Sequence, residues 1–222
     1  MVIMAVSFFF ALVLTGLLWW IAYRDAVTRR FWGLLAAAWT VSIIANVGWG
    51  IYNAMGGEGQ PGWTDLFYLT RYLLVLLAFW LYPAPWSWRR WAELAIALLA
   101  TALLLWLGFI RPIWATTPAN DLVHVVGGAI YPALDVGLLY AAWYRWRTRP
   151  TIRWRNVMVG MLMALLAYSL ANWVNYGMLI TAPEAESILP DIFWFLSDVL
   201  TAIAAWCFLS GDGHAAKEKN PN

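Results

Sequence analysis

The sequence predicts an all-α membrane protein with seven transmembrane helices. Of its 222 residues, 63% are hydrophobic and only 12% are charged. The mean hydropathy of +0.66 is well above that of a soluble domain. Seven apolar runs are each long enough to cross a bilayer, which takes about 20 helical residues. They fall at 4–23, 31–54, 63–83, 91–110, 122–145, 154–180 and 189–209.

Each run has local features that fit a membrane helix. The first begins MVIMAVSFFF, without a basic leader or a small-residue cleavage pattern, so we expect a retained helix rather than a signal peptide. The runs 63–83 and 189–209 open on Asp65 and Asp191, which suit helix N-caps at the interface. Pro132 within 122–145 is expected to free a backbone carbonyl for a ligand or water. The 18 tryptophans are interpreted mainly as an interfacial belt.

The distribution of Lys and Arg predicts the orientation in the membrane. Basic residues collect on the cytoplasmic side, and 12 of the 14 here follow the first, third, fifth and seventh runs. An odd number of helices, with the N-terminus outside and the C-terminus inside, is therefore expected. These basic residues are Arg24, Arg29, Arg30, Arg89, Arg90, Arg145, Arg147, Arg149, Arg153, Arg155, Lys217 and Lys219.

The second half of the chain repeats the first with a shift of 126 residues. Ala45-Asn46 then falls on Ala171-Asn172, and Asp65 falls on Asp191. One transmembrane domain over residues 1–210 is predicted, followed by a cytoplasmic tail at 211–222. Within it, units 4–83 and 122–209 are joined by a linker helix at 91–110. Such a parallel repeat places a pseudo-twofold axis along the membrane normal and a shared site between the units.

Three charged residues lie deep inside the predicted spans, away from their ends, where an unpaired charge costs several kcal/mol. Arg71 lies roughly 12 Å below the start of its helix, and Asp198 lies at a similar depth in the repeat-related helix. Asp135 is deeper, about 20 Å along its own helix. We expect all three to face the interior, with Arg71 paired to Asp198 or Asp135. The alternative is a pair that only sets the packing register.

Polar side chains share one face on several predicted helices. A spacing of i, i+4, i+7 and i+11 places His124, Gly128, Tyr131 and Asp135 together. Similar faces on the runs 31–54 and 154–180 predict a polar, aromatic-lined cavity in the outer half of the bundle. Alternatively, the asparagines only join neighbouring helices, and His124 is a wall residue. The candidate ligand-binding residues are Asp135, Tyr131, His124, Arg71, Asp198, Asn46, Asn172 and Tyr176.

Several functions are excluded by missing residues. A retinal Schiff base needs an intramembrane lysine, and the two lysines are in the tail. Haem held by two axial histidines is excluded, because one of the two histidines is also in the tail. No catalytic or metal-binding motif is present, so an enzyme is not expected. The sequence leaves any cofactor unknown and a bound pigment open, and it indicates no nucleic-acid partner.

The run AIYPALDVGLLYAAW at 129–143, the arginine-rich loop after it and DIFWFLSDVL at 191–200 resemble a known group. This group is the multi-helix membrane sensor region at the N-terminus of many bacterial diguanylate cyclases and some histidine kinases. A "YPxxD" turn and a "P-x-x-x-D-x-x-(F/Y)-x-x-x-Y" helix entry recur in it, and FIRP at 109–112 looks like the ending of its fourth helix. The matching residues are Tyr131, Pro132 and Asp135 for the turn, and Pro61, Asp65, Tyr68 and Tyr72 for the entry.

The resemblance covers most of residues 60–209 and implies a sensor bundle in the bacterial cytoplasmic membrane. The family normally continues into a cytoplasmic catalytic domain, whereas only CFLSGDGHAAKEKNPN follows Trp206 here. The resemblance therefore implies a stand-alone module that signals through a membrane-protein partner or a second copy. Three alternatives stay open: a structural or pigment-holding subunit of a larger membrane complex, a small-solute transporter with 3+1+3 repeats, and a membrane-embedded enzyme.

Overall fold

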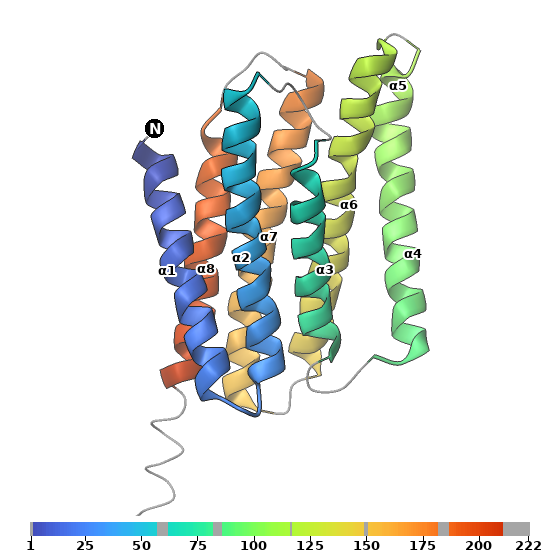
Figure 1. Ribbon diagram of the computed structural model, residues 1–222. Helices are drawn as coiled ribbons and strands as arrows, with labels where there is room; N and C mark the ends of the chain where they lie inside the picture. The colour runs from blue at the N-terminus through green and yellow to red at the C-terminus, as the bar shows by residue number, and fades with distance from the viewer. Residues whose placement is uncertain are drawn as a thin grey trace, which may run out of the picture.

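The computed structural model is all-helical over the residues that it describes, namely 2–56, 62–81, 86–115, 117–148, 151–181 and 187–210 (Figure 1). The predicted tail, 211–222, lies outside them. The main helices are α1 (Val2–Arg24), α2 (Arg29–Ala54), α3 (Asp65–Leu81), α4 (Trp88–Leu105), α6 (Ala119–Arg147), α7 (Ile152–Thr181) and α8 (Leu189–Ser210). A π-helical turn, η1 (Trp106–Ile110), and α5 (Arg111–Ile113) continue α4.

Six of these helices are long and apolar enough to cross a membrane, which fits an all-α membrane protein. They are α1, α2, α6, α7, α8 and the continuous segment formed by α4, η1 and α5. The exception is α3, which has 17 residues; it begins at Asp65 rather than at the predicted 63, and its last described residue is Leu81. The Asp65 carboxylate accepts a hydrogen bond from the Gly62 N–H at 2.6 Å, which fixes this start.

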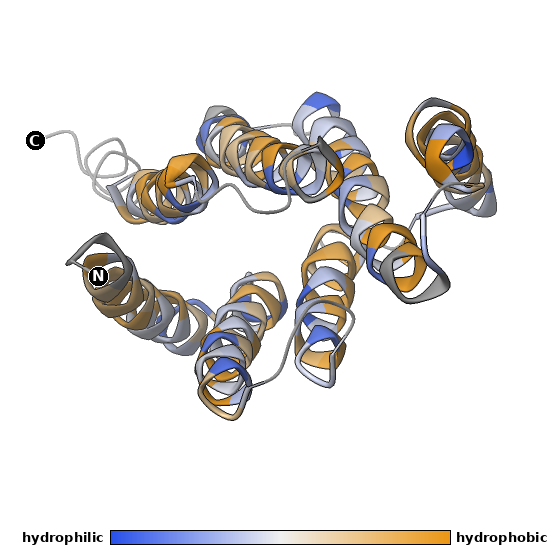
Figure 2. Cartoon of the chain, turned by 90° about the horizontal axis from the view of Figure 1, so that it is seen from above, coloured by the Kyte–Doolittle hydropathy of each residue, from blue (hydrophilic) through white to orange (hydrophobic). Residues whose placement is uncertain are grey.

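The helices form two rows with one helix outside (Figure 2). One row is α1, α2 and α3, and the other is α8, α7 and α6. The rows meet at both ends, where α1 contacts α8 and α3 contacts α6, while α4 packs on the outer side of α6. We call the end where α1 begins, at the top of Figure 1, the upper end.

Aromatic side chains close the lower half of the bundle. Phe31 and Trp32 of α2, Phe79 of α3, Trp154 of α7 and Phe208 of α8 are buried together. Phe31 packs edge-on against Phe79, with ring centroids 5.8 Å apart, and Trp32 lies 5.1 Å from Phe208. Some tryptophans are thus core residues rather than belt residues, although Trp19, Trp20 and Trp88 are exposed as expected.

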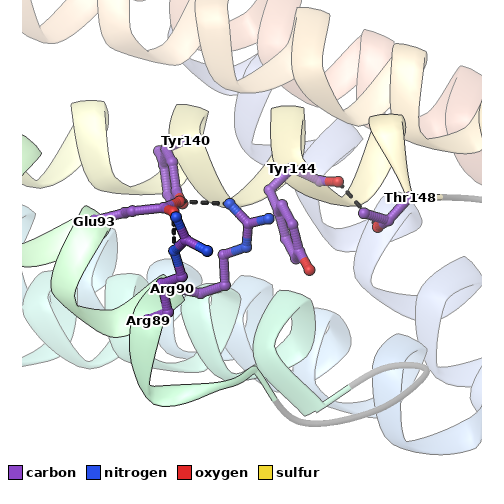
Figure 3. A network of polar contacts seen from close by, with 6 residues as sticks. All are labelled: Arg89, Arg90, Glu93, Tyr140, Tyr144 and Thr148. Atoms are coloured by element: carbon purple, nitrogen blue, oxygen red, sulfur yellow. Dashed lines mark hydrogen bonds and ion pairs between the residues drawn. The ribbon is translucent and has the colours of Figure 1, made fainter.

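Polar contacts fix the lower ends of α3 and α4. The Arg145 guanidinium donates hydrogen bonds to the carbonyls of Phe79 and Trp80 in the last turn of α3. Figure 3 shows Glu93 of α4 accepting hydrogen bonds from Arg90 and from the Tyr140 hydroxyl of α6. These contacts anchor both helices to α6 at the end rich in arginine.

Candidate functional site

A cavity of about 680 Å³ lies between the two rows in the upper half of the bundle. Its residues come from α1, α2, α3, α6, α7 and α8, and more than half of them are aromatic or asparagine. It is lined by Ser7, Phe8, Ala11, Trp39, Ser42, Ile43, Asn46, Trp49, Gly50, Asn53, Tyr68, Arg71, Gly128, Tyr131, Tyr168, Asn172, Asn175, Tyr176, Asp191, Trp194, Phe195 and Asp198.

Arg71 lies in the deep part of this cavity with its guanidinium between aromatic rings. Its central carbon is 3.9 Å from the centroid of Tyr168 and 4.9 Å from that of Trp39. The residue is only 8% exposed. Attraction to ring faces accounts for about 2 kcal/mol when such a cation is desolvated, which is less than the several kcal/mol that burial of a charge costs.

The predicted ion pair of Arg71 is not formed. Within the described part of the chain, Arg71 has no carboxylate partner within the 4.0 Å ion-pair limit, and the ion pairs join Glu93 to Arg89 and Arg90. Asp198 is instead hydrogen-bonded by the indole N–H of Trp39 at 2.9 Å. The indole of Trp39 thus contacts both groups: its face meets the cation and its N–H meets the carboxylate.

Asp135 is buried beside the cavity rather than on its wall. It is 1% exposed and accepts hydrogen bonds from the Tyr72 hydroxyl at 2.7 Å and the Asn172 amide at 2.9 Å. Asn172 also donates to the Tyr72 oxygen at 2.8 Å and accepts from the Trp194 indole at 3.1 Å. The network joins α3, α6, α7 and α8, which fits the structural alternative for Asn172.

The opposite wall carries a second group of hydrogen bonds. The Tyr68 hydroxyl of α3 donates to the side-chain oxygen of Asn46 of α2 at 2.7 Å. Tyr131 of α6 donates to Asp65, which is itself buried and not the solvated cap expected at an interface. Pro132 has no N–H to donate to the carbonyl of Gly128, four residues earlier, and Gly128 is a wall residue.

Six of the eight predicted site residues meet at the cavity, and two do not. Tyr131, Arg71, Asp198, Asn46, Asn172 and Tyr176 line it. Asp135 is behind the wall, and His124 is not among the lining residues; its Nδ1 atom is buried without a hydrogen-bond partner in the described residues. The helical face from His124 to Asp135 is longer than the cavity, so only its two middle residues, Gly128 and Tyr131, line the cavity.

Sequence reasoning missed the aromatic residues that contact the polar groups. Trp39 and Tyr168 flank Arg71, and Tyr72 bridges Asp135 and Asn172. Tryptophan and tyrosine are frequent throughout this chain, so composition did not distinguish them. The repeat offered a guide, because Tyr168 follows the wall residue Ser42 by 126 positions.

The chain matches no protein-family model, no curated protein and no solved structure. No group of three or more His, Cys, Asp or Glu side chains in the described ranges is close enough to hold a metal ion. The arrangement offers aromatic walls, amide groups, one cation and two carboxylates, which are the elements of a small-molecule binding site.

Proposed function

We propose that this protein is a seven-helix, sensor-like membrane module that binds a small or amphipathic ligand in the cavity. The observation that carries the proposal is a concave, aromatic-lined site with a few polar groups in the upper half of the bundle, above an aromatic core in the lower half. A volume of about 680 Å³ falls within the range of pockets that hold drug-sized ligands.

The proposed architecture is two three-helix units related by a pseudo-twofold axis, with α4 as the linker. Two hydrogen bonds support it: Tyr68 donates to Asn46, and Trp194 donates to Asn172, at positions 126 residues apart. The contacts of α1 with α8 and of α6 with α3 are also equivalent under this shift. A ligand between the units would favour one of their relative positions if it binds that position more tightly.

The same proposal includes seven spans, a bacterial cytoplasmic membrane and an outside N-terminus. It is supported by the basic residues at the lower end, in the helix ends that flank the connections after α1, α3 and α6. The upper-end cavity then faces outward. The likeness of Tyr131-Pro132 and Asp135 to the sensor regions of diguanylate cyclases adds the expectation of a membrane partner or a second copy that receives the signal.

A filled cavity tests the proposal. Gly50 lines the cavity, and a Cβ added there meets no atom within 4 Å, so Gly50→Leu should occupy the site without breaking the fold. Gly16→Leu is the matched control, because Gly16 is equally open and lies away from the cavity. Both variants would be purified in mild detergent, with an absorption spectrum and mass spectrometry of the released small molecules.

We expect a molecule that the wild type and Gly16→Leu retain and Gly50→Leu loses. Equal retention of the molecule in all three proteins would refute a ligand site in the cavity. The same conclusion would follow if no molecule, whether retained or added, bound to Gly50→Leu differently from the other two proteins. A stoichiometric visible chromophore would favour the pigment-holding subunit instead.

A transporter is the second candidate, because carriers with parallel repeats bind substrate between the two halves. The position of the cavity between α1–α3 and α6–α8 favours it. Reconstituted liposomes distinguish the two functions: a receptor leaves the identified ligand outside, and a carrier accumulates or exchanges it.

A further inference from the structure

The deep part of the cavity holds an arginine whose guanidinium has no hydrogen-bond or ion-pair partner in the described part of the chain. Arg71 is more than nine-tenths buried and lines the cavity, and within the described residues no hydrogen bond or ion pair reaches its guanidinium. Its central carbon lies over the Tyr168 ring at 3.9 Å and over the Trp39 ring at 4.9 Å. The N–H groups of a guanidinium lie at the edges of its plane. Such an edge matches a carboxylate or phosphate, which accepts two parallel hydrogen bonds.

A simple anion would not suit the rest of the cavity. Asp198 and Asp191, both on α8, line the same space, so its ionisable side chains carry one positive and two negative formal charges. Trp39 holds one oxygen of Asp198 through its indole N–H and contacts Arg71 with its ring. Trp39 thus contacts both charged groups, and no direct ion pair joins them within the described residues. A ligand that carries both charges complements both groups.

We propose that the cavity binds a zwitterionic ligand, whose oxyanion meets Arg71 and whose cationic group meets Asp198. The remaining aromatic wall then receives an apolar portion of the ligand. This inference rests on the proposed ligand-binding function and specifies its ligand class. Two sources share the chemistry: a free amino acid and the headgroup of a zwitterionic phospholipid.

The test uses the full-length protein and a fixed panel of probes. L-Leucine carries both charges, 4-methylpentanoate lacks the amine, and 3-methylbutylamine lacks the carboxylate. Phosphatidylethanolamine and phosphatidylglycerol in nanodiscs form the lipid arm, with and without a zwitterionic headgroup. Thermal unfolding reports binding, because a ligand that binds the native state raises the midpoint temperature.

We expect one zwitterion, leucine or phosphatidylethanolamine, to raise the midpoint, and its single-charge counterparts to have little effect. Arg71→Gln and Asp198→Asn should each weaken binding by roughly 30-fold or more, since each leaves the other charge of a buried pair unmatched. Arg89→Gln is the control, because Arg89 is exposed and lies at the lower end. It should bind like the wild type.

The inference is overturned if neither zwitterion stabilises the protein, if a single-charge probe stabilises it as well, or if Arg71→Gln binds unchanged. A failure of the zwitterion proposal can be distinguished from a failure of the proposed ligand-binding function. A native molecule lost in Gly50→Leu but lacking one of the two charges would keep the ligand site and refute the zwitterion. Where Arg71→Gln fails to fold, Asp198→Asn and the single-charge probes still decide.

Discussion

At the scale of single residues, Tyr72 joins the polar core beneath the cavity. Its hydroxyl donates to Asp135 and accepts from Asn172, so one oxygen atom satisfies groups on α6 and α7. Asp135 is 1% exposed and has no access to solvent that could replace a lost hydrogen bond. A buried polar group left without a partner costs more than its hydrogen bond contributes. Tyr72 is therefore a stabilising residue rather than a ligand contact.

Tyr72→Phe should lower the unfolding free energy by about 1–3 kcal/mol, because it leaves both Asp135 and Asn172 short of a partner. Tyr23→Phe, at an exposed tyrosine, is the matched control and should leave the midpoint temperature unchanged. Thermal unfolding in detergent measures both. Equal midpoints for the two variants would contradict the network.

The two repeat-related asparagines should differ in the same assay. Asn172 forms hydrogen bonds with Tyr72, Asp135 and Trp194, whereas Asn46 accepts one from Tyr68. An interhelical hydrogen bond in a membrane contributes about 0.6 kcal/mol on average and about 1.7 at most. Asn172→Ala should therefore destabilise the protein about two to three times as much as Asn46→Ala. A larger effect at Asn46 would show that Asn172 is not the structural member of the pair.

Periodicity and depth predicted six wall residues, including Arg71 and Asp198, because buried polar groups in apolar helices have few places to face. The partners were not predictable. Depth places Arg71 level with Asp198. Whether the guanidinium contacts the carboxylate or the indole of Trp39 depends on the directions of side chains from three helices. That geometry is set by tertiary packing, which a single sequence does not display.

At the scale of elements, α7 and α8 approach closely at Gly160. A Cβ added there would lie 2.8 Å from the Ala204 Cβ and 3.2 Å from its Cα. Small residues at such contacts let two membrane helices pack backbone to backbone. The α7–α8 contact holds together the two helices that carry the cavity residues Asn172 and Asp198.

Gly160→Ala should destabilise the protein by about 1–3 kcal/mol, the usual cost of overpacking, because the atoms in the way belong to the backbone and Cβ of Ala204. Gly16→Ala has no atom within 4 Å of its new Cβ and should be neutral. Chemical denaturation in mixed micelles measures the difference. A neutral Gly160→Ala would show that α8 can shift away at little cost.

Helix positions were predicted to within a few residues from hydropathy, and the differences have local causes. The run 91–110 was expected to end before Arg111-Pro112, yet the helix continues to Ile113. The π-helical turn at Trp106–Ile110 changes the hydrogen-bond pattern before Pro112, and a proline is tolerated where no N–H is required. Hydropathy carries no information about such a turn.

At the scale of the whole molecule, the spans set which side of the membrane each connection occupies. Arginines gather at the helix ends that flank the lower connections, while α3, with 17 residues, is shorter than the shortest of the six candidate spans, which has 20. Arg145 of α6 holds the end of α3 at that same level. We expect α3 to cross as the third of seven spans, with its buried Arg71 facing the cavity rather than lipid.

Single-cysteine labelling tests this topology. In a Cys207→Ala background, Val27→Cys, Ser87→Cys and Thr151→Cys mark the lower connections, and Ser187→Cys marks the upper one; all four sites are exposed. An impermeant maleimide added to intact cells should label the cysteine at 187 alone, and lysis should make all four reactive. Labelling at 87 but not at 27 would show that α3 does not cross. Labelling at 27, 87 and 151 but not at 187 would show that the orientation is the opposite of the proposed one. The basic lower end would then face outward, and the upper half with the cavity would face the cytoplasm.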